Sequence, residues 1–354
     1  MDSVQMVSAS TGWALIFTSN PSNSSVLAVA RTADGGRTWA LVTPAAPRGS
    51  FVQGTTVLDA ASAQRAWVVG VTPGHKSVIF GTVDAGRSWW RSEAVAAAQP
   101  VAVDFASRSR GWLLESMGAA MGSNPVRVYR TADGGLRWSL AAMSQASGEA
   151  AANGSGLPVE CGKVGISFSS PQAGWIATRC NLGYSILVSR DGGAHWASKQ
   201  LPIPRSACEQ GGCEISEPQF AGNTTFLEMS DYPDAAFLFV SRDAGASWRT
   251  IVMPSGAGPY PRVQFFGPAE GIAVSAGPQG SIGRDFYLTS DGGLTWTPVR
   301  QGRHFGLSGP SFDFASPAIG FAWVAGADSA GSVPSMYRTS DSGRTWTAFV
   351  PHLS

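Results

Sequence analysis

Polar side chains that could bind or convert a substrate concentrate in the irregular stretches of this chain. Carboxyl groups held about 5–10 Å apart can perform glycoside hydrolysis, whereas arginine forks grip carboxylates and, beside tyrosine or histidine, could hold sugars. The candidate ligand- or partner-binding residues are Tyr184, Arg205, Asp231, Tyr232, Asp234, Tyr260, Arg262, Arg284, Asp285, Arg303 and His304. For each of them the alternative is an ordinary solvated loop residue.

No recognisable catalytic constellation accompanies these residues. The four histidines are scattered, and the sequence contains no nucleophile elbow, no phosphate-binding glycine loop and no metal-spaced histidine pair. The catalytic residues stay unassigned, and we expect neither a cofactor nor a metal.

A sequence repeat predicts the elements that position these loops. The pattern Ser/Thr-x-Asp-x-Gly-x-x-Trp occurs seven times, about every 50 residues. Its aspartates are Asp34, Asp84, Asp133, Asp191, Asp243, Asp291 and Asp341. In a hairpin turn such an Asp accepts backbone N–H groups, the Gly adopts a positive φ and the Trp covers the turn. One carboxylate per turn is too few for calcium, so we predict a structural role.

A second hairpin precedes each of these turns, most clearly at Val103-Asp-Phe105…Gly111-Trp112 and Ile166-Ser-Phe168…Gly174-Trp175. Four strands in each of seven units predict an all-β, single seven-bladed β-propeller of antiparallel blades over residues 1–354. The expected blades are 1–46, 47–96, 97–146, 147–204, 205–256, 257–304 and 305–354. We expect no outer strand to be borrowed from the opposite end of the chain.

Polar residues recur at one position of the first strands, eight residues before the Gly-Trp tryptophan position. They are Gln5, Asp59, Asp104, Ser167, Gln264 and Asp313. Such a ring could line a water-filled channel; the alternative is a set of internally satisfied polar groups near buried water. Binding residues belong on the loops opposite the Asp turns, where the connections 143–161 and 201–218 are the longest.

The four cysteines favour disulfides over zinc, because a four-thiolate zinc site normally shows two closely spaced pairs and only one is present. Pairing Ile166 with Trp175 across the hairpin places Cys161 opposite Cys180. Cys208 and Cys213 could close a glycine-containing loop. Two disulfides predict an oxidising compartment, hence a secreted, periplasmic or cell-surface protein, with a signal peptide or anchor removed before Met1.

Composition excludes several classes of partner. A net charge of +1 gives no general attraction to nucleic acid, and no apolar run approaches the ~20 residues of a membrane span. We expect a monomer.

On the seven turns and the compact unit ending in sequences such as Thr131-Ala-Asp-Gly-Gly-Leu-Arg-Trp138, the chain resembles the Asp-box (BNR) propeller superfamily over its full length. That group includes sialidases, xyloglucanases, the sortilin ectodomain and, most similar to this chain, photosystem II assembly/stability factors. Sialidases resemble six-bladed propellers with an early Arg-Ile-Pro, and xyloglucanases resemble two facing propellers. This chain has neither feature. The resemblance specifies the fold and implies very little about function.

The sequence favours an exported, non-catalytic binding or scaffold propeller that presents its loop-rich face to a protein or glycan. The alternative is a glycoside hydrolase, sialidase-like or other, at the channel mouth opposite the Asp turns. It would use Asp231 or Asp234 with Tyr232 or Tyr260, and arginines among Arg205, Arg262, Arg284 and Arg303.

Overall fold

The computed structural model describes residues 2–18, 26–47, 49–72, 74–118, 124–144, 154–180, 183–204, 207–208, 213–231, 235–254, 261–275, 285–299, 311–323 and 336–354. Within these residues the chain is all-β, with seven four-stranded antiparallel blades of the seven-bladed β-propeller class, as predicted. No helix among them is long and apolar enough to cross a bilayer. Contacts divide the chain into two compact units, residues 1–200 with 353–354, and residues 201–352.

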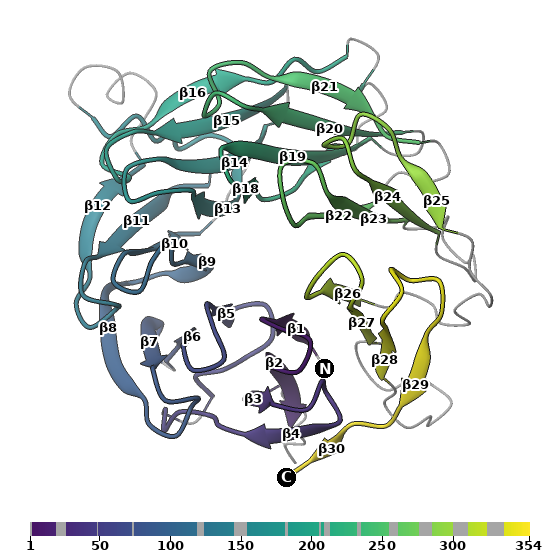
Figure 1. Cartoon of the computed structure of the whole chain (residues 1–354). Coiled ribbons are helices and arrows are strands. Elements are labelled where there is room, and N and C mark those ends of the chain that lie inside the picture. The colour runs from purple at the N-terminus through teal and green to yellow at the C-terminus, as the bar shows by residue number, and fades with distance from the viewer. Residues whose placement is uncertain are drawn as a thin grey trace. The chain divides into compact units, whose positions relative to one another are not determined.

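The first unit holds four blades, each a meander of consecutive strands (Figure 1). Blade one is β1 (Ser3–Met6), β2 (Gly12–Thr18), β3 (Val26–Thr32) and β4 (Thr38–Leu41); blade two is β5 (Val57–Ala60), β6 (Ala66–Val71), β7 (Lys76–Thr82) and β8 (Trp90–Ala97). Blade three is β9 (Gln99–Asp104), β10 (Gly111–Ser116), β11 (Val126–Thr131) and β12 (Ser139–Met143); blade four is β13 (Gly162–Phe168), β14 (Gly174–Cys180), β15 (Gly183–Ser189) and β16 (Ala197–Gln200).

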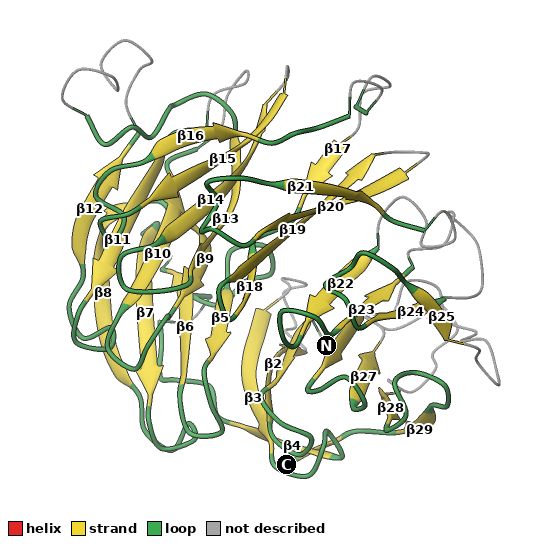
Figure 2. Ribbon diagram, turned by 45° about the horizontal axis from the view of Figure 1, so that its top comes forward, coloured by secondary structure: helices red, strands yellow, loops and turns green. Residues whose placement is uncertain are grey.

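The second unit holds three blades, whose strands are drawn in yellow in Figure 2. Blade five is β17 (Cys213–Ile215), β18 (Gln219–Ala221), β19 (Thr224–Asp231), β20 (Ala235–Ser241) and β21 (Arg249–Val252). Blade six is β22 (Arg262–Phe265), β23 (Gly271–Val274), β24 (Phe286–Thr289) and β25 (Thr297–Val299); blade seven is β26 (Ser311–Phe314), β27 (Gly320–Trp323), β28 (Met336–Thr339) and β29 (Thr347–Phe349). In blade five the first strand is split, since β17 and β18 both pair with β19. The interruption contains Pro218, which has no N–H to give to the ladder.

One expectation about the chain ends is wrong. The C-terminal strand β30 (His352–Leu353) joins the outer edge of β4 as a fifth strand. The amide of Ser354 donates to the Trp39 carbonyl at 3.0 Å, and the Leu41 amide donates to Ser354 at 3.3 Å. A strand of two residues is too short to show a hydrophobic pattern, so it could not be predicted from the sequence.

Each of the seven Asp turns repeats the same local hydrogen-bond pattern. In the first, Thr32 donates its hydroxyl to the Asp34 carboxylate at 2.9 Å, and that carboxylate accepts the amide and hydroxyl of Thr38. The amide of Gly36 in turn donates to the Thr32 hydroxyl. Hydrogen bonds of this kind, led by those from Ser88, Ser247 and Thr295, lower the pKa of Asp84, Asp243 and Asp291 to about 2.

The second-strand aromatic residues join neighbouring blades. Trp67 of β6 stacks on Phe105, beside β9, with ring centroids 3.5 Å apart, and its indole N–H donates to the Gly134 carbonyl in the Asp turn of blade three. Trp112 repeats the arrangement with Phe168 of β13. In the second unit the phenyl ring of Phe226 stacks on Phe265 at the same distance. The Phe…Gly-Trp motif therefore packs between blades as well as forming a hairpin.

Candidate functional site

The polar residues of the first strands are engaged in bonds between blades. Gln5 donates to the Leu58 carbonyl and accepts the Ala60 amide, both at 2.9 Å. Asp59 and Asp104 each accept one amide of the next blade, from Phe105 and Phe168 at 2.9 Å. Gln264 bonds both backbone groups of Phe314 in the same way. These contacts favour the internally satisfied alternative over a water-filled channel.

Two details of this set were not foreseen. Gln219 holds the equivalent position in blade five, accepting the Phe265 amide, but its hairpin pairs it with Phe226, seven residues ahead instead of eight. Burial raises the pKa of Asp59 to about 7, against the opposing hydrogen bond from Phe105. These five side chains hold blades together and are poor candidates for ligand contacts.

The opposite end of each blade carries the connections after the second and fourth strands, and here the blades differ. In blade four the ammonium of Lys163, on β13, is buried beneath carbonyl groups. Its three N–H groups are shared among four carbonyl oxygens, those of Asn124, Glu160 and Cys161 at 2.7–3.0 Å and that of Pro158. Burial lowers the pKa of Lys163 to about 8, and Glu160 opposes the shift. One side chain thus ties the connection before blade four to a loop of blade three.

Blade three buries an acid near the same end. Glu115, on β10, is fully buried, and it lies opposite Arg127 of β11. Burial raises the pKa of its carboxyl group, while Ser77 and Arg127 oppose the shift. A carboxyl with a raised pKa in an apolar surrounding is held toward its neutral form.

Blade five brings two glutamates to one face of its sheet. Glu214 of β17 lies directly opposite Ser230 of β19, and Glu228 is two residues from Ser230, so all three side chains share that face. The Ser230 hydroxyl donates to the Glu228 carboxylate at 2.7 Å. Burial raises the pKa of Glu228 to about 7; Ser230 lowers it, the charge of Glu214 raises it, and Arg262 lowers it.

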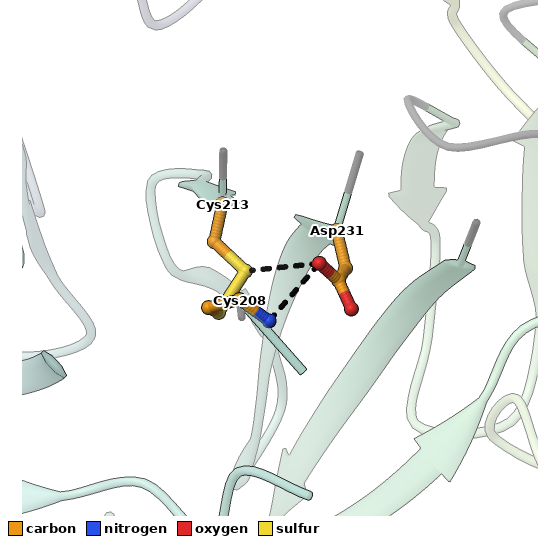
Figure 3. The surroundings of a disulfide bond; sticks show 3 residues. All are labelled: Cys208, Cys213 and Asp231. Carbon is orange, nitrogen blue, oxygen red and sulfur yellow. Dashed lines mark hydrogen bonds between the residues drawn. A yellow bond between two sulfur atoms is a disulfide. The ribbon is translucent and has the colours of Figure 1, made fainter. Parts of the chain in front are cut away.

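The other face of the same strand pair carries a disulfide (Figure 3). Cys208 and Cys213 are bonded, with Cα atoms 5.3 Å apart, and Cys213 pairs directly with Asp231 in the ladder. The Asp231 Oδ1 accepts the Cys208 amide at 3.0 Å and lies 3.7 Å from the Cys213 sulfur. This disulfide favours an oxidising compartment.

The other predicted pair is tested only in part. Cys161 is disulfide-bonded, whereas the side chain of Cys180 is outside the described residues, so their pairing stays a prediction. The register used to infer it was wrong, since Trp175 pairs with Ser167. A bulge near Lys163 then shifts the ladder by one residue, and Gly162 pairs with Arg179, just inside the two cysteines.

Only part of the predicted binding set can be placed. Asp231 and Arg262 lie at the connection end of blades five and six, and the exposed Asp285 precedes β24. The side chains outside the described residues are those of Tyr184, Arg205, Tyr232, Asp234, Tyr260, Arg284, Arg303 and His304. The described chain therefore brings Arg262 within electrostatic reach of Glu228 and places Asp231 against the disulfide.

Sequence reasoning missed the buried ionisable residues at this end. Glu115, Lys163 and Glu228 each interrupt an apolar strand, as in Leu113-Leu114-Glu115 and Phe226-Leu227-Glu228. A charged residue is rarely buried without partners, so a single charge inside a strand of this kind was an available signal.

The comparisons with known proteins identify the fold. No family model matches the chain, and no curated protein matches it. Among solved structures, YCF48 bound to D1 peptide is 14% identical, with a TM-score of 0.52 over 83% of this chain and 81% of that one. The BP39L lectin of Burkholderia pseudomallei is 14% identical, with a TM-score of 0.58 over 97% and 95% of the two chains. At these identities the likeness shows the fold alone.

A third neighbour is an enzyme. The GH74 xyloglucanase of Xanthomonas campestris is 14% identical, with a TM-score of 0.60 over 98% of this chain, which spans 53% of the enzyme. The propeller neighbours thus include a peptide-binding protein, a lectin and a glycosidase.

Proposed function

We propose that this chain is an exported, non-catalytic binding module that presents the connection ends of its blades to a protein or glycan partner. One observation carries the proposal. The polar groups of the Asp turns serve the turns themselves, whereas the connection end holds charged side chains that occur in one blade each: Asp231, Glu214 and Arg262 in blades five and six. Binding residues are commonly carried on irregular loops over a rigid scaffold.

Charge and hydrogen-bonding capacity fit either class of partner. Glu214 and Arg262 are exposed, and Asp231 is half-buried. Carboxylates and a guanidinium together can bind sugar hydroxyl groups, or the backbone and charged side chains of a peptide. We also propose that the chain belongs to the Asp-box superfamily, with the photosystem-factor type as the branch that it most resembles; such membership would agree with a scaffold role.

The test compares the two ends of the blades. The purified protein would be applied to a glycan array and to an array of peptides, and its best ligand measured by calorimetry. Arg262→Ala and Asp231→Asn should each weaken binding about tenfold, while Asp133→Ala, at an Asp turn, should leave affinity unchanged. Unchanged binding by Arg262→Ala and Asp231→Asn, with loss only in Asp133→Ala, would place the functional surface at the turn end.

A glycoside hydrolase is the second candidate, and one observation favours it. Glu228 has a pKa of about 7, which suits a general acid near neutral pH, and Glu214 supplies a second carboxylate on the same face. A panel of fluorogenic glycosides, including a sialoside, would decide between the classes. Turnover that is lost in Glu228→Gln would establish the enzyme and displace the non-catalytic proposal.

A further inference from the structure

The Cys208–Cys213 disulfide lies against the Asp231 carboxylate, which accepts the Cys208 amide and also approaches the Cys213 sulfur. One ligand atom from each of Cys208, Cys213 and Asp231 lies within 4.8 Å of the other two, and Figure 3 shows the Asp231 carboxylate turned toward the Cys213 sulfur. A disulfide sulfur has no hydrogen to donate, so the 3.7 Å approach of the Asp231 Oδ1 to Cys213 is no hydrogen bond. When the disulfide opens, the two sulfur atoms and the Asp231 carboxylate become three neighbouring candidate metal ligands.

We propose that reduction of the Cys208–Cys213 disulfide creates a binding site for one thiophilic divalent cation of the Zn²⁺ class, held by the two thiolates and the Asp231 carboxylate. This goes beyond the proposed binding function and does not depend on it. It also revises the sequence-based expectation of no metal, which for the cysteines considered only a four-thiolate zinc site.

The redox and proton balance is complete with a dithiol reductant. The reductant is oxidised to its own disulfide and delivers two electrons and two protons, which convert the Cys208–Cys213 bond into two thiols. Binding of one divalent cation then releases both thiol protons to solvent, because thiolates are the ligands. Cys208 is half-buried and reachable, whereas Cys213 is buried, so the incoming thiolate attacks the sulfur of Cys208.

The backbone holds the three ligands in place after the bond opens. Cys213 and Asp231 face each other in the β17–β19 ladder, and in the disulfide form the Cys208 amide already donates to the Asp231 carboxylate. The Cα atoms of the two cysteines are 5.3 Å apart, and Zn²⁺ takes sulfur at about 2.3 Å and carboxylate oxygen at about 2.0–2.2 Å. Two soft thiolates select Zn²⁺ over Mg²⁺ or Ca²⁺.

The experiment uses the full chain with the other two cysteines removed, as Cys161→Ser with Cys180→Ser. The reduced protein is titrated with Cd²⁺, followed by the ultraviolet thiolate-to-metal band, and with Zn²⁺ in competition with a chromophoric chelator. We expect one equivalent of metal in the reduced form and none in the oxidised form. Cys213→Ser should abolish binding and Asp231→Asn should weaken it at least tenfold, while Glu270→Gln, at an exposed control carboxylate in blade six, should change nothing.

A second measurement in the parent chain guards against a serine variant that does not fold. After mild reduction, Zn²⁺ should protect Cys208 and Cys213 from alkylation, as read by peptide mass spectrometry, with near-ultraviolet circular dichroism reporting the fold. A reduced, folded protein that shows neither protection nor a Cd²⁺ band overturns the proposal. So does unchanged Zn²⁺ affinity in Asp231→Asn.

Discussion

The two ends of the blades treat polar side chains in opposite ways. At the turn end, Thr32, Asp34 and Thr38 satisfy one another inside one hairpin, and six further turns repeat the scheme. At the connection end, Lys163 occurs in blade four and Glu228 in blade five, each with its own set of partners. In a repeat protein, a residue type that recurs in every unit is one that the fold needs there. A charged residue found in one blade only must be explained by its own surroundings.

This difference also explains what could be predicted. The blades and their hairpins followed from periodicity, because Trp67, Trp112 and their equivalents obey the same packing rules in every repeat. The partners of Lys163 could not be predicted, because they are backbone carbonyls of irregular connections. The predicted register was wrong by one residue at Ser167 and Trp175, and a bulge near Lys163, which leaves no mark in the hydrophobic pattern, then shifts the ladder by one residue.

The largest effect is expected at the connection end, from Lys163→Met. Methionine keeps an unbranched chain in the same space but removes the ammonium group that donates to the carbonyls of Asn124, Pro158, Glu160 and Cys161. Loss of these charge-assisted hydrogen bonds should lower the free energy of unfolding by about 3–5 kcal/mol. Urea denaturation measures the change, with Lys199→Met, on the exposed strand β16, as the matched control. A loss below about 1 kcal/mol would mean that water replaces the ammonium without cost.

A smaller effect tests the bonds between blades. With a folded pKa of about 7 against about 4 in the unfolded chain, Asp59 holds an extra proton in the folded state between these values. The unfolding free energy should therefore fall as the pH rises from about 4 to about 7, and this contribution is then constant. Asp59→Asn keeps an oxygen for the Phe105 amide and removes the titration. Above pH 7 we expect the variant to exceed the parent by about 3–4 kcal/mol, with the gap closing toward pH 4.

Urea denaturation from pH 4 to pH 8 measures this difference. Asp285→Asn, an exposed carboxylate in the other unit, serves as the control and should show a difference near zero throughout. A stability gap for Asp59→Asn that does not change with pH would show that the Asp59 carboxyl stays ionised between the blades.

The turn end should respond less strongly. In the third turn the Asp133 carboxylate accepts the Thr131 hydroxyl and the Arg137 amide, both at 2.9 Å. Asp133→Ala removes the acceptor of both hydrogen bonds, so we expect the unfolding free energy to fall by about 1–2 kcal/mol. Thermal and urea denaturation measure the loss, and affinity for any ligand of the connection end should be retained. A variant that melts like the parent but no longer binds would contradict the division between the two ends.

The smallest effect sharpens the comparison within the turns themselves. The residue after the aspartate adopts a positive φ in every turn, and Ala85 holds it at 66° whereas Gly134 holds it at 79°. A residue with a Cβ is strained by about 1–2 kcal/mol in this region. Glycine relieves that strain, but its greater conformational freedom in the unfolded chain offsets part of the gain in stability. Ala85→Gly should therefore raise the free energy of unfolding by about 0.5–1 kcal/mol, measured by urea denaturation.

The reverse change, Gly134→Ala, should lower it by a similar amount or more, because the added Cβ would meet the Arg108 carbonyl at 3.1 Å. Opposite signs at these two equivalent positions, with ligand affinity unchanged in both, would show that the turns are interchangeable structural units; equal signs would mean that each turn has its own constraint.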